Sequence, residues 1–322
     1  MMNPFVRDLA WVMQSPSLIA SIDSASNLAG RIKLVTDDYC AMIFDKHLGW
    51  LQQLVRNPQL LMDFLSRRKA SKLGYYFEDL VAFWLSQKIA SDFYESHIKI
   101  SSGNRDIGEL DFLFRVEQEV HHWEAAVKFY LYTQNQQGTV TWYGPDTRDT
   151  FSRKLGRMLE HQLRLSDRPE VREILLSRGI NDVSPRMFIK GYLFYPFQMR
   201  IQNTKHLVAG CEISTSHLAG WWLTTDRLNV EQLNSCSPKS LRWRVLPRLE
   251  WLAPRIYSVQ NTEQMLHTSS QIVETVNGQI SHSGNPRLIA GFSLNEAGKW
   301  QEETRGFVVN MGWPDSAVER AH

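Results

Sequence analysis

The chain contains little cysteine, no long apolar run and almost no net charge, and each absence narrows the class of protein. Its three cysteines lie far apart among 322 residues and form neither a Cys-x-x-Cys pair nor a Cys/His zinc spacing. A disulfide framework and a structural zinc site are therefore not expected. No apolar run reaches the roughly 18 residues that a membrane-spanning helix needs. The formal net charge of +2 neither indicates nor excludes nucleic acid, because a basic groove can lie within a balanced total.

Several signatures of catalysis and targeting are missing too. The sequence has no GxxxxGK[ST] or GxGxxG motif and no local signature of a Ser/His/Asp or Cys/His nucleophile. Residues 1–20 have no basic stretch before their apolar residues, and Asp8 interrupts them, so we expect a short helix there rather than a signal peptide. Together with the low cysteine count, this favours a cytoplasmic protein without membrane contact.

The sequence does contain an ordinary globular composition, with 43% hydrophobic and 22% charged residues. Helical spacing predicts helices within 1–70, with a break at Pro58, and another over 71–90. The next predicted elements are, in chain order, strands over 97–101, 108–115 and 120–133, a helix over 147–166 and a strand over 186–196. A helix, three strands, a helix and a strand indicate an α/β fold with a mixed sheet flanked by helices.

The last third of the chain is less regular and rich in tryptophan, because six of the eleven tryptophans follow residue 220. We expect three parts: a helical N-terminal segment (1–70), a core (71–200) and an α+β C-terminal extension (201–322). Residues 276–288 are predicted to form a loop. The pattern leaves open whether the extension is a separate domain or wraps the core.

Charged residues interrupt two of the predicted buried strands. Asp111 lies in GELDFLF (108–114), and Glu124 and Lys128 lie in HWEAAVKFY (122–130). A hairpin of these strands would bring two carboxylates and an ammonium together, and close carboxylates need a cation to neutralise them. A hard ion such as Mg²⁺ or Mn²⁺ suits such an oxygen-rich site. The simpler alternative is a solvated salt bridge on a strand face.

Strand alternation predicts the neighbours of these acids. Asp111 should share a face with Leu113, while Leu110 should point to the opposite face. His122 shares the face of Glu124, but the sequence offers it no partner ligands, so we interpret it as incidental.

The segments GELDFLF and HWEAAVK, preceded by the glutamate-bearing helix GYYFEDL, resemble the PD-(D/E)XK, or restriction-endonuclease-like, nuclease superfamily. The core of that superfamily is a helix, three strands, a helix and a strand, which the resemblance implies for residues 71–196. It also implies a metal-binding role for Asp111, the motif lysine at Lys128 and a helix acid at Glu78 that assists with the metal.

One position departs from the superfamily pattern. The usual Glu-x-Lys motif would put the acid at position 126, which is Ala126, and Glu124 stands two residues earlier, about 7 Å along the strand. Glu124 could take over the metal, or the site could have lost catalysis. The expected function is a Mg²⁺- or Mn²⁺-dependent nuclease acting on DNA, less readily on RNA. The alternative is an inactive nuclease-like fold that binds nucleic acid or other proteins.

The predicted helix over 147–166 supplies further candidates. Gln162 falls on its apolar face, where a buried amide needs partners, and related nucleases often have a glutamine near the active site on this helix. A satisfied core glutamine is the alternative. Lys154, Arg157 and His161 are candidates for phosphate contact, although a basic helix face is often merely solvated.

A closer resemblance covers nearly the whole chain. LGYYFEDLVAFWL, GELDFLF, AVKFYL, KLGRMLEHQLRLS and WLAP look like the bacterial family called domain of unknown function 1853. This resemblance implies no established activity, and the sequence does not indicate an oligomeric state.

Overall fold

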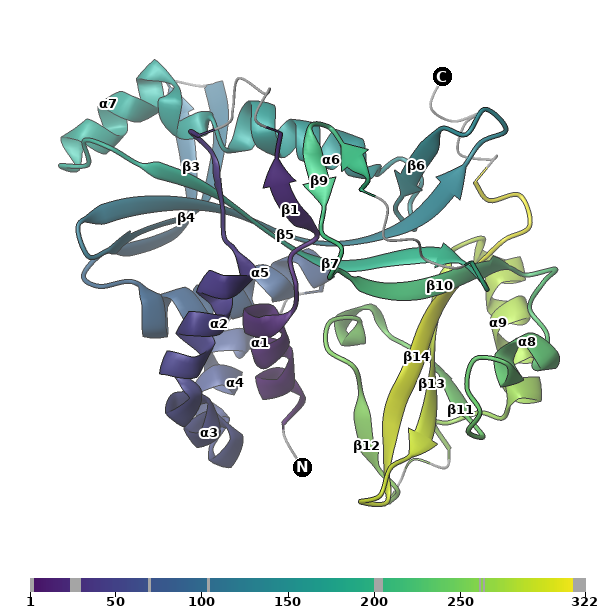
Figure 1. Ribbon diagram of the computed structural model, residues 1–322. Helices are drawn as coiled ribbons and strands as arrows, with labels where there is room; N and C mark the ends of the chain where they lie inside the picture. The colour runs from purple at the N-terminus through teal and green to yellow at the C-terminus, as the bar shows by residue number, and fades with distance from the viewer. Residues whose placement is uncertain are drawn as a thin grey trace.

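A computed structural model describes residues 3–23, 30–68, 71–102, 105–199, 205–260, 262 and 264–314. A large mixed sheet crosses the molecule (Figure 1). Its main strands are, in spatial order, β11 (Arg242–Val245), β13 (Arg287–Leu294), β14 (Lys299–Val309), β10 (Leu218–Thr224), β7 (Ser184–Pro196), β5 (Glu119–Gln134), β4 (Arg105–Val116) and β3 (Tyr94–Ser102). The central strands β5, β7, β10 and β14 run parallel, whereas β3, β4 and β5 form an antiparallel meander. The predicted mixed α/β fold is thereby confirmed.

Short strands complete the sheets. In the main sheet, β2 (Lys33–Leu34) pairs with β7, β6 (Val140–Tyr143) with β5, and β12 (Ile256–Ser258) with β14. A second sheet has the order β1 (Ile19–Ile22), β9 (Cys211–Ile213) and β8 (Leu207–Val208). The sequence pattern predicted only helices before residue 70, and β1 and β2 correct it. Their partners lie far along the chain, so no local pattern marks them as strands.

The N-terminal helices cover one face of the sheet (Figure 1). They are α1 (Pro4–Gln14), α2 (Asp37–Lys46), α3 (Leu48–Arg56), α4 (Gln59–Ser66) and α5 (Leu73–Trp84), which continues as a π-helical turn (Leu85–Ile89). The predicted break at Pro58 is confirmed, because it separates α3 from α4. Trp84 of α5 packs edge-on against Trp123 of β5, with ring centroids 6.1 Å apart, so α5 is fixed beside the central strands.

The opposite face of β5 is covered by α6 (Phe151–Arg157), a π-helical turn (Met158–Gln162), a 3₁₀ turn (Leu165–Asp167) and α7 (Pro169–Ser177). Phe151 stacks on Tyr130 of β5 with ring centroids 4.7 Å apart. The predicted helix start near residue 147 is wrong: Thr150 is the N-cap and accepts a hydrogen bond from the Arg153 N–H. Asp146, just before the predicted start, binds the side chain of Arg148.

The C-terminal strands extend the same sheet, because β10 runs parallel beside β7. The helices of this part are α8 (Val230–Asn234), a 3₁₀ turn (Arg248–Glu250) and α9 (Ser269–Ser283). The predicted loop over 276–288 is wrong for its last two residues, which belong to β13, and for its first eight, which belong to α9. Val276 and Ile280 form its buried stripe, and Gly284, with φ 66°, ends the helix in a left-handed conformation that glycine adopts without strain. The three-part division at residues 70 and 200 remains a prediction.

A buried ionic network joins the two ends of the chain. Asp8 of α1 accepts hydrogen bonds from Tyr76, Arg255 and the Ala253 N–H. Arg305 of β14 is 4% exposed and pairs with Glu302, whose carboxylate also accepts the Arg255 N–H. The first helix and the last strand are therefore held through shared charged groups.

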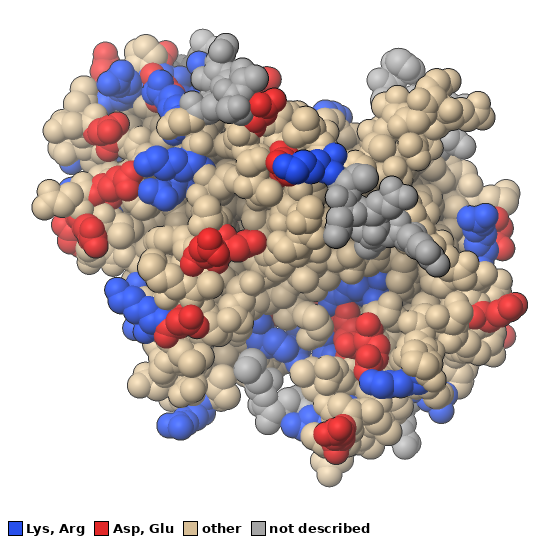
Figure 2. All heavy atoms as spheres, in the orientation of Figure 1, with Lys and Arg blue, Asp and Glu red and all other residues tan. Residues whose placement is uncertain are grey.

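Acidic and basic side chains are interspersed over the face of the molecule shown in Figure 2, without a broad field of one sign. No described helix is long and apolar enough to cross a membrane.

Candidate functional site

Asp111 and Glu124 lie side by side where two strands diverge. The antiparallel pairing of β4 with β5 ends at Phe112 and Trp123, so the next residue on each strand lies at the opening. Asp111 Oδ2 accepts a hydrogen bond from the Ala125 N–H at 3.0 Å, and Glu124 Oε1 accepts one from the Asp111 N–H at 3.4 Å. The predicted proximity of the two acids is confirmed.

The predicted alternation fails at one neighbour of Asp111. Leu110 packs in the same apolar cluster as Leu113, beneath α7, whereas Phe112 belongs to the cluster beneath α5. Pairing with β5 has ended at this point, and His97 in the adjacent strand β3 has φ 54°. The strand is thus free to bend at Asp111, and strict alternation is lost.

Glu124 is fully buried and is held by two side-chain donors. His122 Nε2 lies 2.8 Å from Oε1, and the Gln162 amide donates to Oε2 at 2.6 Å. Burial lowers the pKa of His122 to about 4, so its imidazole is neutral and donates through Nε2. The interpretation of His122 as incidental is wrong. The sequence did contain a signal for this contact: His122 lies two residues before Glu124 and therefore shares its strand face.

Gln162 reaches Glu124 from the π-helical turn after α6. A π-helical turn is wider than an α-helical one, and such a distortion is frequent at functional sites. The side-chain oxygen Oε1 of Gln162 accepts a hydrogen bond from Lys154 Nζ at 3.1 Å. The amide therefore links a lysine to the buried carboxylate, and the predicted partner requirement of Gln162 is met.

Three carboxyl groups at this site have raised pKa values. Burial, followed by the charge of Asp111, raises the pKa of Glu78 to about 7. Burial, followed by the charge of Glu124, raises the pKa of Asp111 to about 7, and burial raises that of Glu124 to about 7. Glu78 lies on α5, with Arg68 at 3.6 Å. The three side chains form the acid cluster.

Lys154, rather than Lys128, is the lysine whose charge acts on Asp111 and Glu124. The positive charge of Lys154 lowers the pKa of both Asp111 and Glu124, and burial lowers the pKa of Lys154 itself. Lys128 instead forms an ion pair with Asp149 at 2.6 Å. Tyr130 donates to the other oxygen of Asp149 at 3.1 Å. The structure thus separates Lys128 from the acids that its sequence spacing associated with it.

A basic groove adjoins the acid cluster. Its volume is about 740 Å³, and its cationic lining consists of Lys128, Arg148, Arg153, Lys154 and Arg157, together with His161. Asp146, Asp149 and Glu160 are its acidic lining residues. The three predicted phosphate-contacting residues all line this groove, and Lys154 belongs to the groove and the acid cluster alike.

The donor set decides which metal suits the cluster. Within the part of the chain that the structure describes, no three His, Cys, Asp or Glu side chains form a group able to hold a metal ion by themselves. Mg²⁺ is usually bound by one or two carboxylates plus phosphate oxygens of the substrate, and Asp111 with Glu124 meets that requirement. Burial is the first cause of their raised pKa values, followed for Asp111 by the charge of Glu124. Two carboxylates are the oxygen donors that a hard ion such as Mg²⁺ prefers.

The sequence matches the family model "Domain of unknown function (DUF1853)" over residues 7–309, and the chain belongs to this family. No curated protein and no solved structure matches the chain.

Proposed function

We propose that this member of the DUF1853 family is a nuclease that hydrolyses phosphodiester bonds of DNA, and less readily of RNA, with Mg²⁺ or Mn²⁺. The observation that carries the proposal is the pairing of Asp111 with Glu124 at the opening between β4 and β5, beside a groove lined with cationic side chains. Carboxylates can hold a metal, and cationic side chains bind the phosphates of a nucleic-acid backbone.

The order of elements supports a restriction-endonuclease-like core. Helix α5, strands β3, β4 and β5, helix α6 and strand β7 follow one another in the chain. This is the order of the PD-(D/E)XK superfamily, to which we assign the fold. In that assignment α5 supplies Glu78, β4 supplies Asp111 and β5 supplies Glu124.

Each side chain has a role in this proposal. Asp111 and Glu124 would hold the metal, with Glu78 assisting, and the bound metal would polarise the scissile phosphate. Neutral His122 and Gln162 fix the Glu124 carboxylate by hydrogen bonds.

The cationic side chains have two separate roles in this proposal. Lys154 is the ammonium nearest the acids and would orient the attacking water or stabilise charge on the phosphate. The phosphate backbone of the nucleic acid, on either side of the scissile phosphate, would be contacted by Lys128, Arg157 and His161. This division follows from the contacts of the two lysines, because Lys128 is engaged with Asp149.

Cleavage assays test the proposal directly. Single-stranded DNA, double-stranded DNA and RNA are incubated with the protein and Mn²⁺, then with Mg²⁺, and EDTA should abolish cleavage. Asp111→Asn should lose at least 100-fold of the activity. Asp92→Asn is the matched control, because Asp92 is an exposed carboxylate that pairs with Arg115. Cleavage that survives Asp111→Asn would show that another site, or a contaminant, is responsible.

A second function is favoured by one specific observation. Ala126 stands where the superfamily has its motif acid, and Lys128 points to Asp149 instead of the acid cluster. An inactive nuclease-like fold that binds nucleic acid through the basic groove would keep these features. Retention of labelled DNA without metal-dependent cleavage, and loss of retention in Arg157→Gln, would favour this second function.

A further inference from the structure

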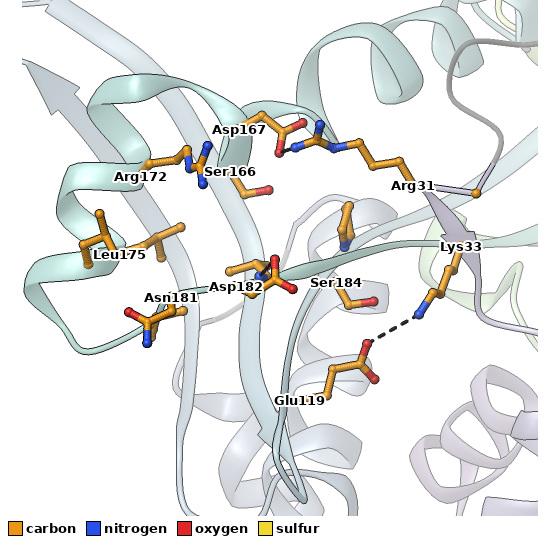
Figure 3. A pocket seen from close by; sticks show the side chains of 15 residues that line it. Arg31, Lys33, Glu119, Ser166, Asp167, Arg172, Leu175, Asn181, Asp182 and Ser184 are labelled. Atoms are coloured by element: carbon orange, nitrogen blue, oxygen red, sulfur yellow. Dashed lines mark hydrogen bonds and ion pairs between the residues drawn. The ribbon is translucent and has the colours of Figure 1, made fainter.

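A second pocket lies outside the acid cluster and the basic groove. Its volume is about 350 Å³, and its walls come from residues 30–33, the start of β5, the turn before α7, α7 itself and residues 180–185 (Figure 3). None of its lining residues belongs to the groove, so the proposed nuclease activity does not account for it. The volume lies at the lower end of the range of small-molecule sites.

Most charges in this pocket neutralise one another. Arg31 pairs with Asp167, and Lys33 lies 3.5 Å from Glu119, as the dashed lines in Figure 3 mark. Glu119 also accepts a hydrogen bond from Arg186 at 3.1 Å. These pairs form a charged rim in which the cationic side chains of Arg31 and Lys33 are already engaged.

Two donors in the pocket have no partner within the described part of the chain. Arg172 of α7 is the remaining cation of the lining, and its guanidinium has no ion pair or hydrogen bond to any described residue. Ser166 is 6% exposed, and its buried hydroxyl has no hydrogen-bond partner among the described residues. Figure 3 shows both groups on the same side of the pocket, with the Ser166 hydroxyl pointing into it. A buried hydroxyl without a protein partner is costly, so an acceptor group of a ligand at this place would be stabilised by it.

The opposite wall of the pocket carries a hydrogen-bond acceptor and apolar side chains. Asp182 lies across from Arg172 (Figure 3), and one of its oxygens accepts the Val183 N–H at 2.9 Å, which leaves the other oxygen available as an acceptor. Leu175 and Ile180, both 4% exposed, contribute the apolar wall. The pocket therefore offers donors for an anion at one side, an acceptor across from them and apolar surface between.

We propose that this pocket binds a small organic anion. Its carboxylate or phosphate group contacts Arg172 and Ser166, and a hydroxyl or amino group of the same molecule faces Asp182. An arginine beside a hydroxyl donor is suited to either anionic group, because the guanidinium fork matches the geometry of both.

Binding of simple anions to the full-length protein tests the site. Inorganic phosphate and acetate are titrated separately by calorimetry at constant ionic strength, and they distinguish the two anionic groups. We expect saturable binding of one of them at millimolar concentration, and affinity at least about tenfold lower in Arg172→Gln. Arg168→Gln is the matched control, because Arg168 precedes α7, is exposed and does not line the pocket. It should bind the anion as the wild type does.

Two further variants distinguish this pocket from the basic groove. Arg153→Gln removes a cation from the groove and should leave the isotherm unchanged, whereas a loss in this variant would place the anion in the groove and overturn the proposal. Ser166→Ala should lower affinity about threefold without lowering the melting temperature, because the hydroxyl has no partner to lose. Unchanged affinity in both Arg172→Gln and Ser166→Ala, or no saturable binding of either probe up to about 10 mM, would show that the pocket is not an anion site.

Discussion

Asp111 and Glu124 hold one another through the backbone of the neighbouring strand. The Asp111 carboxylate accepts the N–H of the residue after Glu124, while the Glu124 carboxylate accepts the N–H of Asp111 itself. These two hydrogen bonds replace the strand pairing that ends one residue earlier. The acids are thus positioned without a metal, and the protein bears the electrostatic cost of keeping two carboxylates close in a buried place.

Neutralising Asp111 should stabilise the metal-free protein. Asp111→Asn keeps an oxygen that accepts the Ala125 N–H but removes the charge that burial and Glu124 disfavour. In EDTA at pH 8 we expect the free energy of unfolding to rise by about 1–2 kcal/mol, measured by urea denaturation. Asp92→Asn, the exposed control, should change it by less than about 0.5 kcal/mol. A loss of stability in Asp111→Asn would contradict the pKa assigned to this carboxyl group.

The same carboxyl groups give the stability a definite pH dependence. The folded-state pKa values of Glu78, Asp111 and Glu124 are about 7, above the ordinary values of 4.5 and 3.8. The folded protein therefore binds extra protons, and the stability that these groups contribute is fully present below about pH 4 and is lost as the pH rises through 7. His122, with a pKa lowered to about 4, acts oppositely between pH 4 and 6.5.

Above pH 6.5 the effect of His122 is complete, whereas the raised pKa values of the acid cluster still lower the stability. We expect the free energy of unfolding in EDTA to fall between pH 6.5 and 8, and to fall less in Asp111→Asn. Addition of Mn²⁺ should remove most of the fall, because the cation binds the ionised carboxylates. A stability that rises over this interval, or a variant as steep as the wild type, would show that the acid cluster does not carry the dependence.

The proximity of Asp111 and Glu124 was predictable because the connection between their two strands is short enough to define a hairpin. The separation of Lys128 from these acids was not, because it depends on Asp149, which lies in a turn 21 residues later. The approach of Lys154 depends on the π-helical turn that brings Gln162 against Glu124, and a single-residue distortion of a helix leaves no recognisable periodicity. Local spacing therefore predicted that the two acids lie together, but it did not predict that Lys154 lies beside them while Lys128 pairs with Asp149.

The fold shows the same limit at a larger scale. Strands β3, β4, β5 and β7 were predicted within three residues of their ends, because each carries apolar residues at strand spacing or in a continuous run. Strand β1 was missed, because the strand that it pairs with, β9, lies about 190 residues away. The helix α9 was missed because its buried stripe is narrow, with only Ile272, Val276 and Ile280 buried among polar residues.

The two lysines should differ in their effect on metal binding as well as on cleavage. Lys154→Met removes a positive charge beside Asp111 and Glu124. We therefore expect Mn²⁺ to bind about threefold more tightly, because charge repulsion is relieved, while cleavage falls at least 100-fold. Calorimetric titration of Mn²⁺ measures the first effect, even without a substrate.

Lys128→Met provides the matched comparison. Its ammonium is bound to Asp149, so Mn²⁺ affinity should stay within about twofold of the wild type, and KM for DNA should rise more than kcat falls. Equal effects of the two substitutions on Mn²⁺ affinity would refute the assignment of Lys154 to the acid cluster.

The buried network between the chain ends predicts how the protein unfolds. Arg305→Met would leave Glu302 buried without its guanidinium and remove a hydrogen bond to the Trp251 carbonyl. Breaking a buried ion pair from one side costs about 3–5 kcal/mol, whereas Arg287→Met, at a partly exposed arginine bound to Gln279 and Ser283, should cost less than about 1 kcal/mol.

The shape of the transition decides whether the C-terminal extension is an independent domain. The strands of the extension continue the core sheet through β10 and β7, and Arg255 binds Asp8 of the first helix. We therefore expect tryptophan fluorescence and far-ultraviolet circular dichroism to report one shared unfolding transition, in the wild type and in Arg305→Met alike, with only its midpoint shifted. Two separated transitions in Arg305→Met would instead mean that residues after about 200 fold by themselves and that the network merely attaches them to the core.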